Sequence, residues 1–255
     1  MTYTNQEQEL LERLPQGALV DHRMLADINR RLKLTTKKAL NGLLSGLYQK
    51  GALVRLTRGR YLVAKNEQPD PLLIGCSLFK GYVSFDTALF FYGYRHTFSS
   101  TVYCATNRTV KARAQIRGAR YVGVPLGRLA FGYVYDGGRR IATKAKLVFD
   151  IVYTRFRYIE EMQPLLDLIG DLDDASAAEF LSYTDLINET AMRERAGFLF
   201  SAARGSGRVT DYLLGKIGKK VVVKLNPGIR SLGSYSREWG VYDNAGIGGP
   251  GSRGA

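Results

Sequence analysis

Leucines recur at helical spacing through the N-terminal part of the chain and predict three helices. The first is expected over residues 5–14, and Asp21 can cap the second. The third is expected to start at Thr35 or Thr36 and to end at Lys50. Its apolar stripe consists of Leu40, Leu43, Leu44 and Leu47.

Alternating apolar and polar positions follow the third helix. Residues 52–56 and 60–63 lie on either side of a short segment that contains Gly59, which predicts a hairpin of two strands. Three helices followed by such a hairpin are the element order of a winged helix-turn-helix, whose third helix enters the DNA major groove.

The side of the third helix opposite the leucines is polar and cationic, and more cations flank the helix and the hairpin. Lys can reach guanine acceptors or phosphates, and Asn can pair with adenine. Backbone N–H groups at the start of the helix can hold a phosphate. Exposed lysines are also often only solvated, and many winged helices contact proteins. The candidate DNA-binding residues are Arg30, Arg31, Lys33, Thr35, Thr36, Lys37, Lys38, Asn41, Ser45, Arg55, Arg58 and Arg60.

Beyond residue 84 the pattern mixes helices with strands. Ser84 can cap a helix that runs to Tyr92, and another helix is expected over residues 143–155. Four more helical segments and a strand over residues 219–225 follow. The prediction is an α+β fold: a winged helix-turn-helix, then a larger domain with a small, mostly antiparallel sheet and a helical C-terminal part. The expected strands of this sheet are residues 101–105, 119–124, 131–135 and 139–142.

Shifts in composition divide the chain. Residues 66–71 are polar with two prolines close together, which predicts a linker. The last ten residues are mostly glycine and predict a disordered tail or an artificial extension. The expected organisation is a DNA-binding winged helix-turn-helix at 1–66, a linker at 67–72, an α+β domain at 73–245 and the tail at 246–255.

Composition excludes several classes of protein. Hydrophobic residues make up 45% of the 255 residues, enough to bury a core, which excludes disorder throughout. The two cysteines lack CxxC spacing, which excludes a disulfide framework and a cysteine zinc site and suits a reducing cytoplasm. The sequence contains no apolar run of about 18 residues, so we expect no membrane span.

The net charge is +14, and the charges are segregated along the chain. Residues 75–158 carry 14 basic and 3 acidic residues, whereas residues 159–204 carry 3 basic and 10 acidic ones. A segregated positive field favours polyanions such as nucleic acid. One basic group could extend a DNA footprint along the backbone, or it could be a solvated loop or a surface facing the acidic block. Its members are Arg108, Lys111, Arg113, Arg117 and Arg120.

The sequence shows no arrangement typical of catalysis. His22 and His96 lack a recognisable Ser or Cys partner, and Cys104 lies within an apolar strand. Residues 205–208, Gly-Ser-Gly-Arg, precede a helix but lack the P-loop pattern. The acidic residues of the helical part lack EF-hand spacing, and helix capping explains them better than a metal. We expect no catalytic residue, no metal and no cofactor.

Five segments resemble motifs of the AbiEi-type antitoxin family, in the family's order. Residues 82–93 resemble its opening motif, and residues 101–106 resemble the strand that follows. Residues 141–150 are similar to its vAtpEKAllD motif, with the Glu-Lys replaced. Residues 195–200 look like its RlGyLle motif, and residues 237–244 look like its terminal tryptophan motif. With the winged helix, the resemblance covers nearly the whole chain.

The resemblance implies an antitoxin of a type IV toxin–antitoxin system, a transcriptional repressor that binds inverted repeats in the promoter of its own operon. It implies double-stranded DNA as one partner and, without a stable complex, a nucleotidyltransferase-like toxin as the other. Two rival hypotheses stay open. The chain could be a transcriptional regulator with a sensing C-terminal domain and no toxin, or a nucleic-acid-modifying enzyme that holds its substrate on the basic surface.

Overall fold

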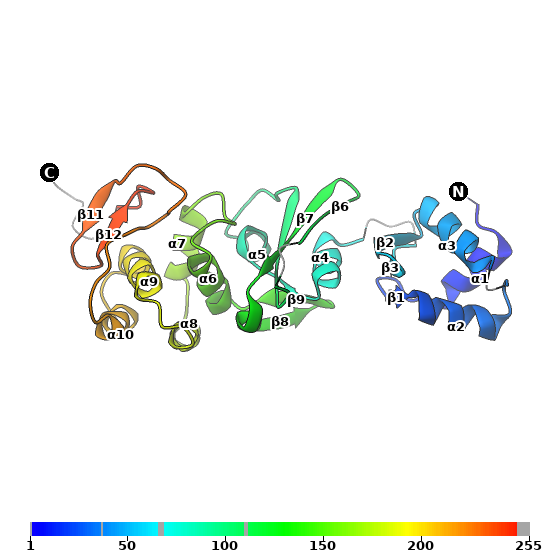
Figure 1. Cartoon of the computed structure of the whole chain (residues 1–255), viewed down its shortest axis with the longest axis horizontal. Coiled ribbons are helices and arrows are strands. Elements are labelled where there is room, and N and C mark those ends of the chain that lie inside the picture. The colour runs from blue at the N-terminus through cyan, green and yellow to red at the C-terminus, as the bar shows by residue number, and fades with distance from the viewer. Residues whose placement is uncertain (1, 37, 66–68, 110–111, 249–255) are drawn as a thin grey trace.

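The computed structural model of the chain describes residues 2–36, 38–65, 69–109 and 112–248. Its parts follow one another along a long axis, with the N-terminal unit at one end, a mixed sheet in the middle and the C-terminal helices at the other end (Figure 1). The fold is α+β, as the sequence predicts. Within the described ranges, no helix combines the length and the hydropathy that a bilayer-spanning segment requires.

The N-terminal unit is a winged helix-turn-helix of three helices and an antiparallel sheet. In this sheet β3 lies between β1 and β2, and the hairpin β2–β3 forms the wing. The sequence predicts the helices and the hairpin but not β1, because a strand of three residues is too short to show an alternation of apolar and polar positions. The elements are α1 (Asn5–Glu12), β1 (Leu19–Asp21), α2 (His22–Leu32), α3 (Leu40–Gln49), β2 (Leu53–Thr57) and β3 (Arg60–Val63).

A side-chain cap explains where α2 begins, but not where α3 begins. Asp21 caps α2 as predicted, and its carboxylate accepts a hydrogen bond from the N–H of Met24 at 2.8 Å. By contrast, α3 starts at Leu40, later than predicted. Thr36 caps only the turn before it, where its hydroxyl accepts from the N–H of Ala39 at 3.2 Å. The threonine signal therefore marks a turn, and the helix starts with the first buried leucine.

Part of the segment predicted as a linker is helical. α4 (Pro71–Phe79) begins at Pro71, and the carboxylate of Asp70 accepts from the N–H of Leu72 at 2.8 Å. Proline is favoured in a first helical turn because its missing N–H needs no partner there. The predicted linker at 67–72 thus overlaps α4, and residues 66–68 lie outside the described residues.

A mixed sheet forms the middle of the molecule, with its described strands in the order β6-β7-β5-β4-β9-β8. The β5–β7 and β4–β9 pairs are parallel, and the other neighbouring pairs are antiparallel. The alternation of apolar and polar residues cannot predict which strands pair in parallel, because parallel pairing joins strands that are distant in sequence. The strands are β4 (Tyr82–Val83), β5 (Thr101–Thr106), β6 (Ala112–Ile116), β7 (Ala119–Pro125), β8 (Tyr133–Asp136) and β9 (Arg139–Ala142).

Helices cover both faces of this sheet and continue into the C-terminal part. α4 packs closely on one face, where a Cβ at Gly75 would lie 2.7 Å from Sγ of Cys104. α5 packs on the other, with the rings of Phe85 and Tyr103 in an edge contact at 6.5 Å. The remaining helices are α5 (Phe85–Phe91), η1 (Gly127–Leu129), α6 (Lys144–Tyr153), α7 (Gln163–Gly170), α8 (Asp174–Asp185), α9 (Thr190–Arg204) and α10 (Arg208–Lys216).

A small sheet of β10 (Val223–Lys224), β12 (Val241–Asp243) and β11 (Ser234–Ser236) closes this end of the molecule. Trp239 packs so tightly on α9 that a Cβ at Gly197 would lie 1.9 Å from its ring. Of the predicted tail, residues 246–248 are described, and the N–H of Gly248 donates to Asp243 at 2.8 Å. Residues 249–255 lie outside the described residues.

The wing sheet packs on both of its faces. Leu53 and Val63 belong to the core of the N-terminal helices. Val54, Leu56 and Leu62 belong instead to the larger core, which runs from α4 to β12. The N-terminal unit is therefore joined to the rest of the molecule by an apolar contact as well as by the chain.

Candidate nucleic-acid interface

The two sides of α3 differ in exposure in the way that the sequence predicts. Leu40, Leu44 and Leu47 are buried and anchor the helix. Asn41 and Ser45 are exposed on the outer side. α3 therefore presents a polar face to solvent, although contact of that face with DNA stays a prediction.

The turn that precedes α3 is held by Asn29, a buried residue of α2. Its carboxamide accepts from the N–H of Thr35 at 3.1 Å and donates to the carbonyl of Thr35 at 2.9 Å. The backbone N–H of Thr35 is thus occupied, which corrects the expectation that it is available to a phosphate. Thr36 and Lys38 are exposed, and Lys37 lies outside the described residues.

A groove of about 550 Å³ separates α3 from the wing. Asn41 and Ser45 line it on the α3 side, and Arg55 and Arg58 line it on the wing side. Polar side chains therefore face cations across one concave surface, an arrangement that suits base edges on one side and a phosphate backbone on the other. The lining residues are His22, Asn41, Leu44, Ser45, Tyr48, Arg55, Arg58, Gly59 and Tyr61.

A hydrogen bond positions Asn41 within this groove. Nε2 of His22 lies 3.1 Å from Oδ1 of Asn41. Because Oδ1 can only accept, His22 is the donor, and the NH2 group of Asn41 keeps both of its hydrogens for another acceptor. Sequence reasoning missed His22, which only the packing of α2 against α3 brings into the groove. It also missed Tyr48, although this residue follows Asn41 and Ser45 at helical spacing on α3.

The other predicted cations of the N-terminal unit lie in different surroundings. Arg31 and Lys33 are exposed at the end of α2, and Arg30 forms an exposed ion pair with Asp27. Arg60 is half-buried and donates to the carbonyl of Ser77 of α4 at 3.5 Å. The structure thus places Arg60 against the larger domain and away from the groove.

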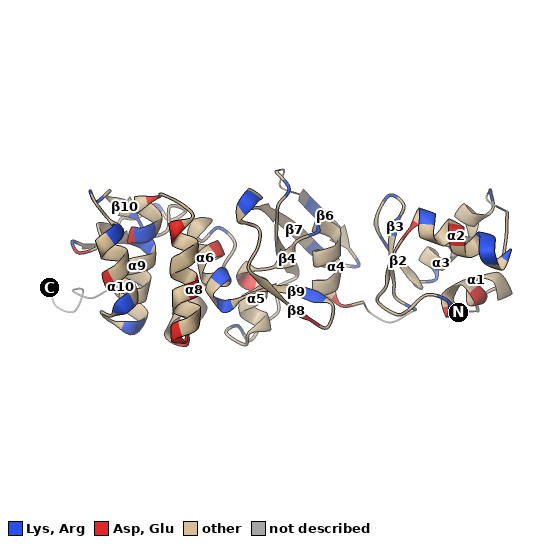
Figure 2. Cartoon of the chain, turned by 90° about the horizontal axis from the view of Figure 1, so that it is seen from below, with Lys and Arg blue, Asp and Glu red and all other residues tan. Residues whose placement is uncertain are grey.

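Among the described members of the second basic group, Arg113 and Arg120 lie on strands, whereas Arg108 and Arg117 lie outside them. Figure 2 shows Lys and Arg on β6 as well as on α2. Arg113 on β6 and Arg120 on β7 are exposed and, by the strand register, lie on the same face of the sheet. Arg117, in the turn between them, donates to the carbonyl of Gly51 at 2.9 Å. This turn therefore touches the winged helix. Arg108 is exposed, and Lys111 lies outside the described residues.

A fully buried ion pair lies inside α6. Lys146 contacts Asp150, whose second oxygen accepts from Ser84 at 2.8 Å and from Tyr82 at 3.0 Å. Burial raises the pKa of Asp150, although Lys146 and the two hydroxyl groups oppose that effect. The ammonium of Lys146 also lies 4.7 Å from the ring centre of Phe149. These groups satisfy one another and do not face solvent.

The candidate nucleophiles are also enclosed. Cys76 and Cys104 are both buried, and a hydrogen bond from Cys104 lowers the pKa of Cys76 to about 7. Sγ of Cys76 donates to the carbonyl of Arg140 at 3.3 Å. Among the described residues, no three His, Cys, Asp or Glu side chains are grouped as metal ligands.

The fold and the groove define a winged-helix protein with an appended α+β domain. No family model and no curated protein matches the sequence. Among solved structures, the chain is similar to the RV2827C protein from Mycobacterium tuberculosis, with a TM-score of 0.65 and 17% sequence identity. The similarity covers 92% of this chain and 88% of that one, so it shows a shared fold across both parts of the molecule.

Proposed function

We propose that this protein is a DNA-binding repressor of its own operon and the antitoxin of a type IV toxin–antitoxin system. The observation that carries the DNA-binding half is the groove, in which Asn41 and Ser45 face Arg55 and Arg58. In this proposal α3 reads base edges in the major groove, and the wing contacts phosphates. The promoter is expected to contain inverted repeats.

The antitoxin half rests on the ordered resemblance to the AbiEi-type family. The motif at residues 141–150 keeps one residue of the family's Glu-Lys pair, which is described above as replaced. Aligned letter by letter, residues 141–150 place Lys146 at the Lys of the family's Glu-Lys, so only the Glu is replaced, by Ala145. The larger domain then opposes a nucleotidyltransferase-like toxin, without a stable complex and without catalysis of its own.

The DNA-binding half is tested by fluorescence anisotropy with the DNA upstream of the protein's own gene, over a series of salt concentrations. The logarithm of affinity should fall with the logarithm of salt concentration by about 0.9 for each phosphate neutralised. Arg58→Gln should reduce this slope by about one contact, whereas Asn41→Ala should reduce the preference for the operator and leave the slope unchanged. If neither substitution changes binding, the groove does not read DNA.

The antitoxin half is tested by expression with the product of the neighbouring gene. If the neighbouring gene encodes a nucleotidyltransferase-like protein that stops growth, restoration of growth by this protein supports the antitoxin role. The Asn41→Ala variant should restore growth as well. A neighbouring gene of another kind favours the regulator without a toxin. Turnover of DNA, RNA or nucleotides by the purified protein with Mg²⁺ favours the enzyme.

A further inference from the structure

A second site candidate lies among the C-terminal helices, and it is independent of the function proposed above. α9 ends at Arg204, and three residues lead from it into α10 at Arg208. Gly205 has φ +75°, a backbone conformation that L side chains rarely adopt. The chain therefore reverses within a very short loop, which brings both arginines to the same side of the molecule.

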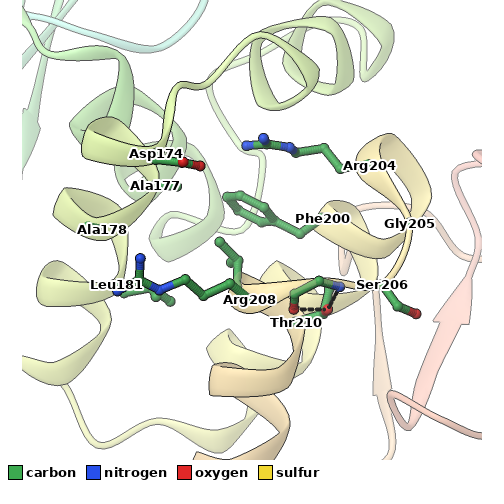
Figure 3. A pocket seen from close by; sticks show the side chains of 12 residues that line it. Asp174, Ala177, Ala178, Leu181, Phe200, Arg204, Gly205, Ser206, Arg208 and Thr210 are labelled. Atoms are coloured by element: carbon green, nitrogen blue, oxygen red, sulfur yellow. Dashed lines mark hydrogen bonds between the residues drawn. The ribbon is translucent and has the colours of Figure 1, made fainter.

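A cavity of about 210 Å³ opens between this loop and α8 (Figure 3). Its inner wall is apolar and includes Phe200, which is 1% exposed, and Leu181. The side chains of Arg204 and Arg208 extend along the cavity on opposite sides of Phe200 (Figure 3). Asp174 contributes a carboxylate to the rim.

The two guanidinium groups retain free hydrogen-bond donors. Nη1 of Arg204 donates to the carbonyl of Leu172 at 2.9 Å, which fixes this side chain and leaves its other N–H groups available. The side chain of Arg208 is exposed and makes no hydrogen bond or ion pair with the described residues. Guanidinium groups match the oxygen atoms of phosphates and carboxylates, and the pair outnumbers the charge of Asp174.

We propose that this cavity binds the phosphoryl group of a small phosphate monoester. A tetrahedral phosphoryl group can accept from guanidinium groups on two sides, whereas a planar carboxylate pairs best with one. A cavity of about 210 Å³ suits a phosphoryl group with a short carbon stem. Whole nucleotides are of the size that needs a pocket of about 300 Å³ or more. The apolar wall packs against the stem.

The test is a titration of the full chain with glycerol 3-phosphate, inorganic phosphate or acetate, followed by ¹H–¹⁵N NMR. The amide signals of Gly205 and Gly207 should shift saturably, and glycerol 3-phosphate should bind more tightly than inorganic phosphate. An equal response to acetate would overturn the choice of a phosphoryl group. Tighter binding of inorganic phosphate would overturn the choice of a monoester.

Substitutions distinguish specific binding in this cavity from non-specific electrostatic attraction of anions to the protein. Arg208→Gln should weaken binding of glycerol 3-phosphate at least tenfold, and Arg230→Gln, which removes another exposed cation, should leave it unchanged. Ala178→Leu, at an exposed position on the cavity wall, keeps both arginines but fills the space, and should also weaken binding at least tenfold.

Normal binding by Ala178→Leu, or equal losses in Arg208→Gln and Arg230→Gln, would overturn the site. Both Arg208 and Ala178 are exposed, so neither variant depends on repacking of the core, and an unchanged melting temperature checks the fold. Affinity for operator DNA without the phosphate ester should be the same in all three variants. Failure of this proposal is therefore distinguishable from failure of the proposed DNA binding.

Discussion

The α3 groove of the winged helix and helix α6 of the larger domain use charged residues in opposite ways. Around the α3 groove, Arg55 and Arg58 are exposed, and none of the described residues that line this groove is acidic. In α6, Lys146 and Asp150 are fully buried and bind each other. A charge that stays in water remains available to a partner, whereas a buried charge must be paired within the fold. The number of basic residues in the sequence therefore overstates the exposed positive charge, because it also counts buried, paired cations such as Lys146.

The largest effect that sharpens this comparison is expected at the buried pair. Lys146→Met leaves the carboxylate of Asp150 buried without its cation, which should destabilise the protein by about 3–5 kcal/mol. Unfolding in urea, followed by the fluorescence of the buried Trp239, measures the loss. The double variant Lys146→Met with Asp150→Leu should lose less than Lys146→Met alone. A small loss in Lys146→Met would show that the pair contributes little.

The next effect is expected in the groove, on binding and not on stability. Asn41→Ala should cost about 1–3 kcal/mol of discrimination at one base pair of the operator, because its carboxamide no longer contacts a base edge. His22→Ala should cost less at the same base pair, since it removes only the group that orients Asn41. Competition binding with single-base-pair operator variants measures both. Losses spread evenly over all base pairs would contradict a reading role for Asn41.

A third effect concerns Glu7, which is buried within the winged helix and bonded to Lys50 and to the N–H of Thr4. Burial alone would raise its pKa, but these hydrogen bonds outweigh burial and lower the pKa from 4.5. A lowered pKa in the folded state stabilises the protein above the unfolded value, and this contribution is lost as the pH falls through the folded pKa.

Glu7→Gln should therefore destabilise the winged helix by about 1.5 kcal/mol at pH 7. Thermal unfolding followed by circular dichroism measures the difference from the unmodified chain. The difference should shrink as the pH falls below 4.5. If the difference in stability between Glu7→Gln and the unmodified chain is the same at pH 7 and below pH 4.5, the charge of Glu7 contributes nothing to stability.

The smallest effect is expected at the exposed ion pair of Asp27 and Arg30 on α2. Asp27→Asn should cost only about 0.2–0.5 kcal/mol of stability, because the pair spans one helical turn in water. It should also strengthen DNA binding slightly at low salt, since it frees Arg30. Thermal unfolding and anisotropy measure the two effects. A loss above 1 kcal/mol would place this pair with the buried charges.

Much of the fold could be predicted from local patterns, and the failures have physical causes. The leucines of α3 and the Asp21 cap could be read directly, because helical spacing and capping are local. The whole of α4 was missed, and its first turn was predicted as linker because Asp70-Pro71 suits a turn and a first helical turn equally well. β6 was missed because alanines alternate with Arg113 and Gln115 and only Ile116 is a large apolar residue, so that hydrophobic periodicity is weak.

The candidate site could be predicted only in part, for a different reason. Asn41 and Ser45 follow from the helix periodicity, and Arg58 follows from the hairpin turn. His22 belongs to the groove only because α2 packs across α3, and Arg60 leaves it only because the wing packs on α4. Such contacts between distant segments have no signature in a single sequence.

In the proposed repressor, the apolar contact between the wing sheet and α4 would have a consequence for how two copies occupy inverted repeats. Val54, Leu56 and Leu62 belong to the core of the larger domain, and Arg117 reaches across to Gly51. The larger domain therefore has little freedom to rotate relative to the winged helix-turn-helix. Each bound copy must project its long axis at one set angle from the duplex, so the spacing of the two half-sites decides whether neighbouring bodies collide or clear each other.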